Sequence, residues 1–206
     1  MSTSKPRQPD RPYSSYHHGN LRDALVAAGL ELLESGQTAE VSLRELARQV
    51  GVSANATYRH FANKDALLAA MAAEGFRRLA TVQAEAAMTR SQPAEMFLES
   101  GRAYVNFARR YPALFRLMFG RFTVMNRSEE INDAGQLALQ GLRYGVAAAL
   151  GREPDDAVVA TSAIYAWSLV HGLSQLILDG HFDDQGDIEE LVSAVLRQAA
   201  DFGKKT

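Results

Sequence analysis

A short stretch in the N-terminal third of the chain gathers side chains that can contact nucleic acid. Tyr58, Arg59, His60 and Lys64 carry groups that can donate hydrogen bonds to phosphate oxygens, and Asn55 can reach a base edge. Phosphate contacts position a protein on a duplex, whereas contacts to base edges read its sequence. These residue types therefore predict a nucleic-acid site, provided that the chain brings them to one surface.

The spacing around this stretch predicts two short helices joined by a tight turn. Ser42 and Glu45 stand three residues apart, as in a capping box, and predict a helix that begins just after Ser42. Gly51 tolerates the left-handed conformation of a sharp reversal, and Ser53 is suited to cap the next helix, expected at residues 54–61. This pattern is typical of a helix-turn-helix, whose second helix presents its N-terminal residues to base edges.

Two further helices are predicted around this unit. Asn20 and Asp23 open a first helix that ends near Gly36, and Asn63 caps a helix whose first turn holds Lys64. The backbone N–H groups at that second helix start, together with the lysine, would form a phosphate site.

Residues 21–71 resemble the N-terminal domain of TetR-type transcriptional regulators. The resemblance rests on a pattern that spans the turn and the helix after it: Gly51, Val52, Ser53, Tyr58, His60, Phe61 and Lys64. It implies an N-terminal three-helix bundle that contains the helix-turn-helix, followed by a C-terminal helical domain for ligand binding and dimerisation.

The resemblance also implies which side chains touch DNA. The expected contacts are Ser42, Arg44, Ser53, Ala54, Asn55, Thr57, Tyr58, Arg59, His60 and Lys64. Ser42 and Arg44 would touch the backbone or an adjacent base, and Arg59, His60 and Lys64 would hold phosphates. Thr57 stands where the family usually has an apolar residue or proline, so its side chain either reaches DNA or turns inward.

The composition agrees with this resemblance. The chain has no cysteine, which excludes disulfides, thiolate zinc sites and thiol nucleophiles and fits a cytoplasmic location. Its net charge is −2, yet residues 1–80 carry ten Lys and Arg against eight Asp and Glu, so a modest positive bias lies at the end expected to contact DNA.

The first residues, 1–16, are rich in Pro, Ser and Arg and predict a disordered arm. Its Lys5, Arg7 and Arg11 either follow the minor groove or remain solvated. We expect residues 17–66 to form the DNA-binding domain.

His17 and His18, beside the first helix, either contact phosphate or are simply exposed. We expect no metal site, because the neighbourhood of these histidines lacks further ligands.

Residues 67–206 are expected to form a helical ligand-sensing and dimerisation domain. Apolar residues recur from 68 to 86 in steps of three or four, which predicts one long helix leading away from the DNA end. Helical periodicity then continues with no alternating strand pattern, so the predicted fold class is all-α. Bulky side chains in this part line either a small-molecule pocket or an ordinary core. The pocket candidates are Tyr104, Phe107, Phe115, Met118, Phe119, Tyr165, Trp167 and His171.

Residues 157–178 contain no Asp, Glu, Lys or Arg. Polar side chains such as His171 and Gln175 interrupt this stretch and its flanks are acidic, which argues against a membrane span. A helix that is apolar nearly all round must be covered on most sides. We therefore predict a homodimer in which this helix pairs with its copy, and residues 188–202 complete a four-helix interface with apolar residues at Leu191, Val192, Val195, Leu196 and Ala199.

Trp167, His171 and Gly172 further resemble the signature of a TetR subgroup with a WHG-type C-terminal domain. Trp167 and His171 lie one turn apart on one helix face. His171 either binds an effector or is satisfied inside the helix bundle, where Gly172 would permit close packing.

We predict a homodimeric transcriptional regulator, a repressor by resemblance, that binds a palindromic operator and is released by a small, largely apolar effector. The chain shows no catalytic constellation, and we expect no enzymatic activity and no cofactor. The acidic segment 179–187 departs from the EF-hand pattern because Asp184 stands where that pattern requires glycine. The alternative is a helical module that binds proteins or small molecules without binding DNA.

Overall fold

The computed structural model describes residues 21–36, 41–126, 128–184 and 186–202, and these residues form helices and their connections without a strand. The predicted all-α fold is confirmed. The predicted arm, His17, His18 and the cap at Asn20 lie outside the described residues.

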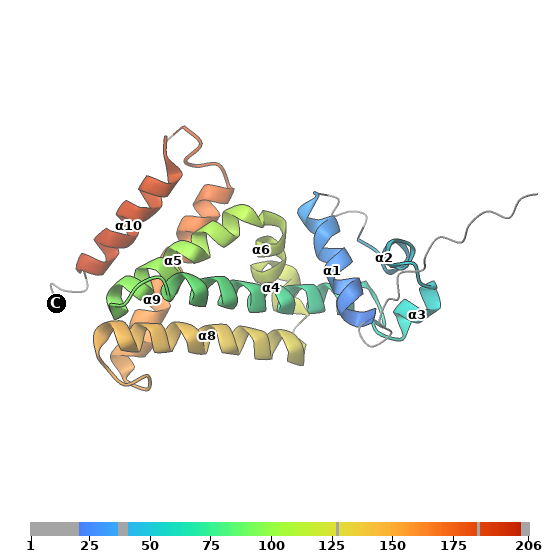
Figure 1. Ribbon diagram of the computed structural model, residues 1–206, viewed down its shortest axis with the longest axis horizontal. Coiled ribbons are helices and arrows are strands. Elements are labelled where there is room, and N and C mark those ends of the chain that lie inside the picture. The colour runs from blue at the N-terminus through green and yellow to red at the C-terminus, as the bar shows by residue number, and fades with distance from the viewer. Residues whose placement is uncertain (1–20, 37–40, 127, 185, 203–206) are drawn as a thin grey trace, which may run out of the picture.

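The N-terminal head consists of α1 (Leu21–Glu34), α2 (Leu43–Val50) and α3 (Ala54–Tyr58), at one end of the molecule (Figure 1). Leu25, Leu30, Leu46 and Phe61 are almost fully buried and form the centre of the head. Burial of these side chains holds helices that are too short to be stable alone.

The long helix α4 (Lys64–Ala87) runs from the head into the body (Figure 1). It packs on α1 at the head end and on α5 and α8 further along. One continuous cluster of buried side chains reaches from Leu25 of α1 to Leu196 near the C-terminus, so the boundary expected after residue 66 falls inside both a helix and a core.

The body is built from α5 (Pro93–Arg110), α6 (Pro112–Phe119), α7 (Arg121–Met125), α8 (Glu129–Leu150), α9 (Ala157–Leu178) and α10 (Ile188–Phe202). Proline occupies the first turn of α5 and of α6, where its missing N–H costs nothing. Gly151, with φ 63°, ends α8 in the left-handed conformation. Helices α5, α8 and α9 pack on one another, and α10 packs on α5.

A glycine allows α4 to approach α6 closely. A Cβ atom at Gly75 would lie only 2.6 Å from Sδ of Met118 and 2.9 Å from Cδ1 of Leu114. Leu114 and Met118 are almost fully buried, and α6 also contacts α1. The absent side chain therefore sets the packing distance where the head meets the body.

Helix α9 is only partly covered by its own chain. It is long and apolar enough to cross a membrane by length and composition, and 28% of its most apolar 18-residue window is buried. Val159, Ala163 and Leu173 face the interior, whereas Val158, Ile164 and Tyr165 are exposed on the opposite side.

Helix α10 offers fewer apolar side chains to the predicted dimer interface than the sequence indicated. Val192 is fully buried and Leu196 is 5% exposed, both within their own chain. These two side chains are therefore not free to contact a partner, and that part of the prediction is wrong. Leu191, Val195 and Ala199 remain half-exposed.

Candidate DNA-binding face and aromatic cluster

The two helices of the predicted helix-turn-helix begin at the expected caps. Ser42 Oγ accepts from the Glu45 N–H at 3.2 Å, and Ser53 Oγ accepts from the Ala56 N–H at 3.2 Å. Gly51 has φ 79° and ψ 30° and reverses the chain between them. The Glu45 carboxylate pairs with Arg48 in place of the reciprocal half of a capping box. That pairing lowers the pKa of Glu45.

The second helix is shorter than predicted. Helix α3 ends at Tyr58, not at Phe61, and the chain tightens after it, since the His60 N–H donates to the Thr57 carbonyl only three residues back, at 3.0 Å. This tight turn directs the Phe61 ring into the core, where it is 2% exposed.

Thr57 turns inward, which decides between the two interpretations left open by the sequence. Its side chain is 0% exposed, and its hydroxyl donates to the Ala54 carbonyl at 2.7 Å. A side chain so enclosed cannot touch DNA, so its inclusion among the DNA contacts is wrong. The family usually has an apolar residue or proline at this buried position. Threonine is tolerated there because its hydroxyl already donates a hydrogen bond within its own helix.

The remaining predicted contacts lie at the surface of the head. All are exposed except Ala54, which is half-buried: Ser42, Arg44, Ser53, Ala54, Asn55, Tyr58, Arg59, His60 and Lys64. Tyr58 is 48% exposed, so its ring and hydroxyl lie at the surface beside the other predicted contacts.

A hollow of about 270 Å³ joins the start of α2, the end of α3 and the start of α4. Its lining includes four of the predicted contacts, namely Ser42, Arg44, Tyr58 and Lys64. Asn63 also lines it and caps α4, since its Oδ1 accepts from the Ala66 N–H at 2.9 Å. The N–H groups of the first turn of α4 and the Lys64 ammonium together provide donors and positive charge for a phosphate.

Five of the eight pocket candidates meet in one cluster of rings in the body, which we call the aromatic cluster: Tyr104, Phe115, Phe119, Trp167 and His171. Tyr104 and Phe115 are buried, whereas Trp167 is 41% exposed, so the cluster reaches the surface at that ring. The centroids of Phe119 and His171 lie 4.8 Å apart, and those of Phe115 and Phe119 lie 4.9 Å apart. Phe76 of α4 joins them, with its ring edge-on to Phe119 at 5.2 Å. Sequence reasoning missed Phe76 because only the fold brings α4 beside α6.

The polar atoms of the aromatic cluster form a short chain. Trp167 Nε1 donates to the Tyr104 hydroxyl at 3.3 Å, and that oxygen lies 2.9 Å from Nδ1 of His171. Burial raises the pKa of the Tyr104 phenol well above its ordinary value of 10, so the hydroxyl keeps its proton at neutral pH. Burial also lowers the pKa of His171 from 6.5. A protonated phenol beside a neutral imidazole lets Tyr104 donate to Nδ1.

The other three pocket candidates lie elsewhere. The Phe107 ring packs on Tyr111, with centroids 5.2 Å apart, and Met118 packs against Gly75. Tyr165 is 55% exposed on the outer side of α9. Phe107 and Met118 therefore belong to the core, and Tyr165 belongs to the surface.

The chain resembles known proteins over almost its whole length. Residues 25–71 match the model of bacterial regulatory proteins of the tetR family, and residues 97–199 match the tetracyclin repressor-like C-terminal domain. No curated protein is significantly similar in sequence.

Among solved structures, a protein of unknown function from Rhodococcus sp. RHA1 is 31% identical, with a TM-score of 0.77 over 91% of this chain and 97% of that one. A tetR-family transcriptional regulator from Streptomyces coelicolor is 21% identical, with a TM-score of 0.68 over 86% of this chain and 78% of that one. The TetR-family regulator PfmR from Thermus thermophilus shares the fold at 18% identity, with a TM-score of 0.60 over 86% of this chain and 97% of that one. With both domains matched, the chain belongs to the TetR family of DNA-binding transcriptional regulators, which are not enzymes.

Proposed function

We propose that this protein is a homodimeric repressor that binds a palindromic operator through its helix-turn-helix and leaves it when a small, largely apolar effector binds the body. The observation that carries the DNA contacts is the hollow between the starts of α2 and α4, which Arg44, Tyr58 and Lys64 line. Repression itself is proposed from family membership.

The proposed contacts divide into two kinds. Lys64, with the first turn of α4, holds a phosphate, and Arg59 and His60 hold others along the same strand. Asn55, at the exposed start of α3, faces the major groove beside Ala54 and Tyr58.

What supports the homodimer is the exposed apolar side of α9. Val158 and Tyr165 lie seven residues, or two helical turns, apart on that side, and Ile164, beside Tyr165 in the chain, is 61% exposed. A monomer would leave this surface in water. Two heads related by a two-fold axis then meet half-sites about 34–36 Å apart.

The proposed effector site is the aromatic cluster. Its rings offer an apolar surface with one polar centre, the Tyr104 hydroxyl and His171, which suits an apolar molecule that carries a single hydrogen-bonding group. The rings touch one another directly, so an effector enters by displacing them. This displacement then changes the position of the N-terminal head.

The test begins with selection of bound sequences from a random pool of duplexes, followed by anisotropy titrations of the winning site at several salt concentrations. We expect a palindrome bound by two subunits, with an affinity that falls steeply as salt rises. Lys64→Ala should reduce the slope of log affinity against log salt by about 0.9 for each phosphate that the variant no longer neutralises.

Arg197→Ala is the matched control, because Arg197 is an exposed cation on α10, far along the chain from the head. It should leave the slope unchanged. Failure to enrich any sequence, or an affinity indifferent to salt, would favour a helical module that binds other proteins instead.

A further inference from the structure

The Arg22 side chain, in the first turn of α1, touches both the DNA head and the body. Its guanidinium lies over the Phe61 ring, with Cζ 5.2 Å from the centroid, and it also donates to the Glu130 carboxylate of α8 at 2.5 Å. Phe61 directly follows the turn that ends α3, and it is almost fully buried. Arg22 therefore connects α8 with the base of α3.

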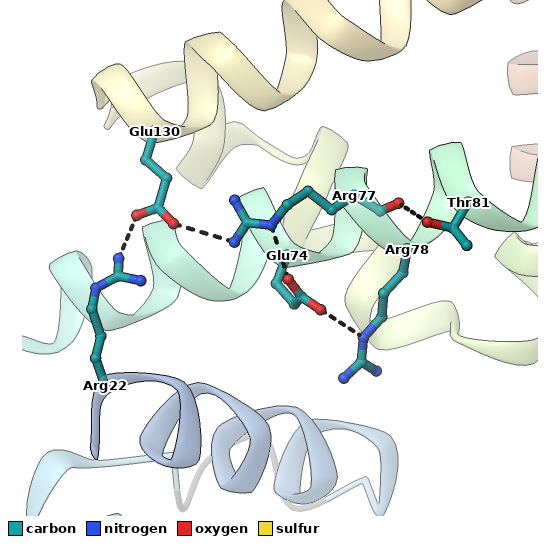
Figure 2. A network of polar contacts seen from close by, with 6 residues as sticks. All are labelled: Arg22, Glu74, Arg77, Arg78, Thr81 and Glu130. Atoms are coloured by element: carbon teal, nitrogen blue, oxygen red, sulfur yellow. Dashed lines mark hydrogen bonds and ion pairs between the residues drawn. The ribbon is translucent and has the colours of Figure 1, made fainter. Parts of the chain in front are cut away.

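Glu130 has a second partner, and the contacts continue back to α1. It accepts from Arg77 of α4 at 3.3 Å, Arg77 pairs with Glu74 at 2.9 Å, and Glu74 pairs with Arg78 at 3.3 Å (Figure 2). Arg78 in turn pairs with Glu34, in the last turn of α1, at 3.3 Å. Both ends of α1 are thus tied to α4 and α8 by one chain of ion pairs.

These pairs are suited to set an orientation, not to hold the fold together. The side chains of the Arg22–Glu130 pair are 38% and 32% exposed, and the other members are exposed to a similar extent. Pairs of this kind add little to the free energy of unfolding and weaken in salt. The apolar contacts between α1, α4 and α6 hold the head against the body, and the ion pairs add charge contacts at both ends of α1.

The N-terminal end of α8 also shares a hollow with Phe76, the ring of α4 that contacts the aromatic cluster. Ile131, Asn132 and Gly135 of α8, with Phe76 and Thr123, line a hollow of about 320 Å³ directly after Glu130. The Phe76 ring is the member of that lining that contacts Phe119. Phe76 is therefore the side chain through which a rearrangement of the rings could reach the turn of α8 that follows Glu130.

We propose that Glu130 couples the body to the N-terminal head. Its pairs with Arg22 and Arg77 fix the orientation of the head relative to α4 and α8, and loss of the Arg22–Glu130 pair allows the head to change that orientation. The functional part of this inference, an effect on operator affinity, rests on the proposed function. The structural part, the control of head orientation, does not.

The first experiment measures orientation without DNA. The chain has no cysteine, so spin labels at Ala27→Cys on α1 and Met88→Cys at the end of α4 are the only labelled sites. Both positions are exposed. Labelled chains diluted into an excess of unlabelled chains report distances within one chain, whatever the oligomeric state.

Glu130→Gln is expected to broaden or shift the distance distribution. Glu129→Gln is the matched control, because Glu129 also lies in the first turn of α8 and its replacement removes the same charge from the same helix end. It should match the wild type. At about 1 M salt, where charges are screened within about 3 Å, the wild type should approach Glu130→Gln, which itself should not change. Identical distributions for the wild type and Glu130→Gln would overturn the proposal.

A double-mutant cycle identifies the partner. Arg22→Gln and Glu130→Gln should each alter the distribution, and the double variant should add little to Glu130→Gln, which already removes the pair with Arg22 together with the pair with Arg77. If Arg22→Gln alone acts, stacking on Phe61 explains the result and the assignment to Glu130 fails.

Operator affinity gives the functional readout. Relative to Glu129→Gln, Glu130→Gln should weaken operator binding by about twofold to fivefold, the range expected for one partly exposed pair. Altered distances with an unchanged operator affinity would overturn the coupling role. A wild-type protein that binds no duplex would instead overturn the proposed function, and the distance measurements would still decide whether Glu130 sets the orientation.

Discussion

At the scale of single residues, the Tyr104 hydroxyl is the polar centre of an otherwise apolar group of rings. It contacts both Trp167 Nε1 and His171 Nδ1, and the residue is 4% exposed. Tyr104→Phe should destabilise the protein by about 1 kcal/mol, because it leaves two polar atoms without this partner. Urea unfolding measures the loss, and Tyr144→Phe, which removes a hydroxyl from a ring that is 62% exposed, should have almost no effect.

Protonation of His171 is expected to destabilise the folded protein. Burial lowers its pKa below the ordinary 6.5, so the unfolded chain binds the proton more readily than the folded one. The contribution to stability is complete above about pH 6.5 and is lost as the pH falls toward the lower pKa of the folded state. Protonation of Nδ1 would also remove the acceptor that Tyr104 uses.

His171→Asn should therefore flatten the decline of the melting temperature between pH 7.5 and 5, whereas His181→Asn, at an exposed histidine, should leave the wild-type decline unchanged. Parallel curves for the wild type and His171→Asn would contradict this assignment.

Single residues also show where sequence reasoning works and where it fails. The caps at Ser42, Ser53 and Asn63 were predictable, because each depends on a partner only three residues away. The sequence could not decide whether the Thr57 side chain points into the core or toward DNA, because its hydrogen bond within α3 does not reveal which side of that helix the core occupies. The Arg22–Glu130 pair spans 108 positions and leaves no local pattern.

At the scale of elements, the contact between α4 and α6 depends on the missing side chain at Gly75. Gly75→Ala should destabilise the protein by roughly 1–3 kcal/mol despite the better helix propensity of alanine, because the new methyl group overlaps Met118 and Leu114. Gly141→Ala provides the control, since a Cβ there meets nothing within 4 Å. It should stabilise α8 by about 0.5–1 kcal/mol. Thermal unfolding of both variants measures these changes in stability. Changes of the same sign in Gly75→Ala and Gly141→Ala would contradict the packing argument.

A helix boundary can be predicted from the sequence when residues close to it in the chain determine where the helix ends. Helices α9 and α10 have the bounds that the sequence predicted, because Asp156 caps the one and Asp187 accepts from the first N–H groups of the other. Helix α3 ends earlier than predicted, because the need to bury Phe61 overrides a helical pattern that could have continued.

At the scale of the whole molecule, the exposed side of α9 is the interface of the proposed homodimer. Ile164→Asp should convert the proposed dimer into monomers, because it places a carboxylate in an apolar interface at a cost of roughly 2 kcal/mol or more per subunit. Sedimentation velocity across a range of concentrations measures the change. Met88→Asp, at a methionine that is 77% exposed beyond α4, should leave the dimer intact. Dimers that survive Ile164→Asp would place the interface elsewhere.

The uninterrupted length of α4 has a mechanical consequence. Its 24 residues span about 36 Å, with Lys64 at one end and the packed body around the other. Such a rod acts as a lever: a tilt of about 5° at the body end moves Lys64 by about 3 Å, roughly the length of one hydrogen bond. A rearrangement too small to change the shape of the body would therefore be amplified into one large enough to break the phosphate contact proposed for Lys64.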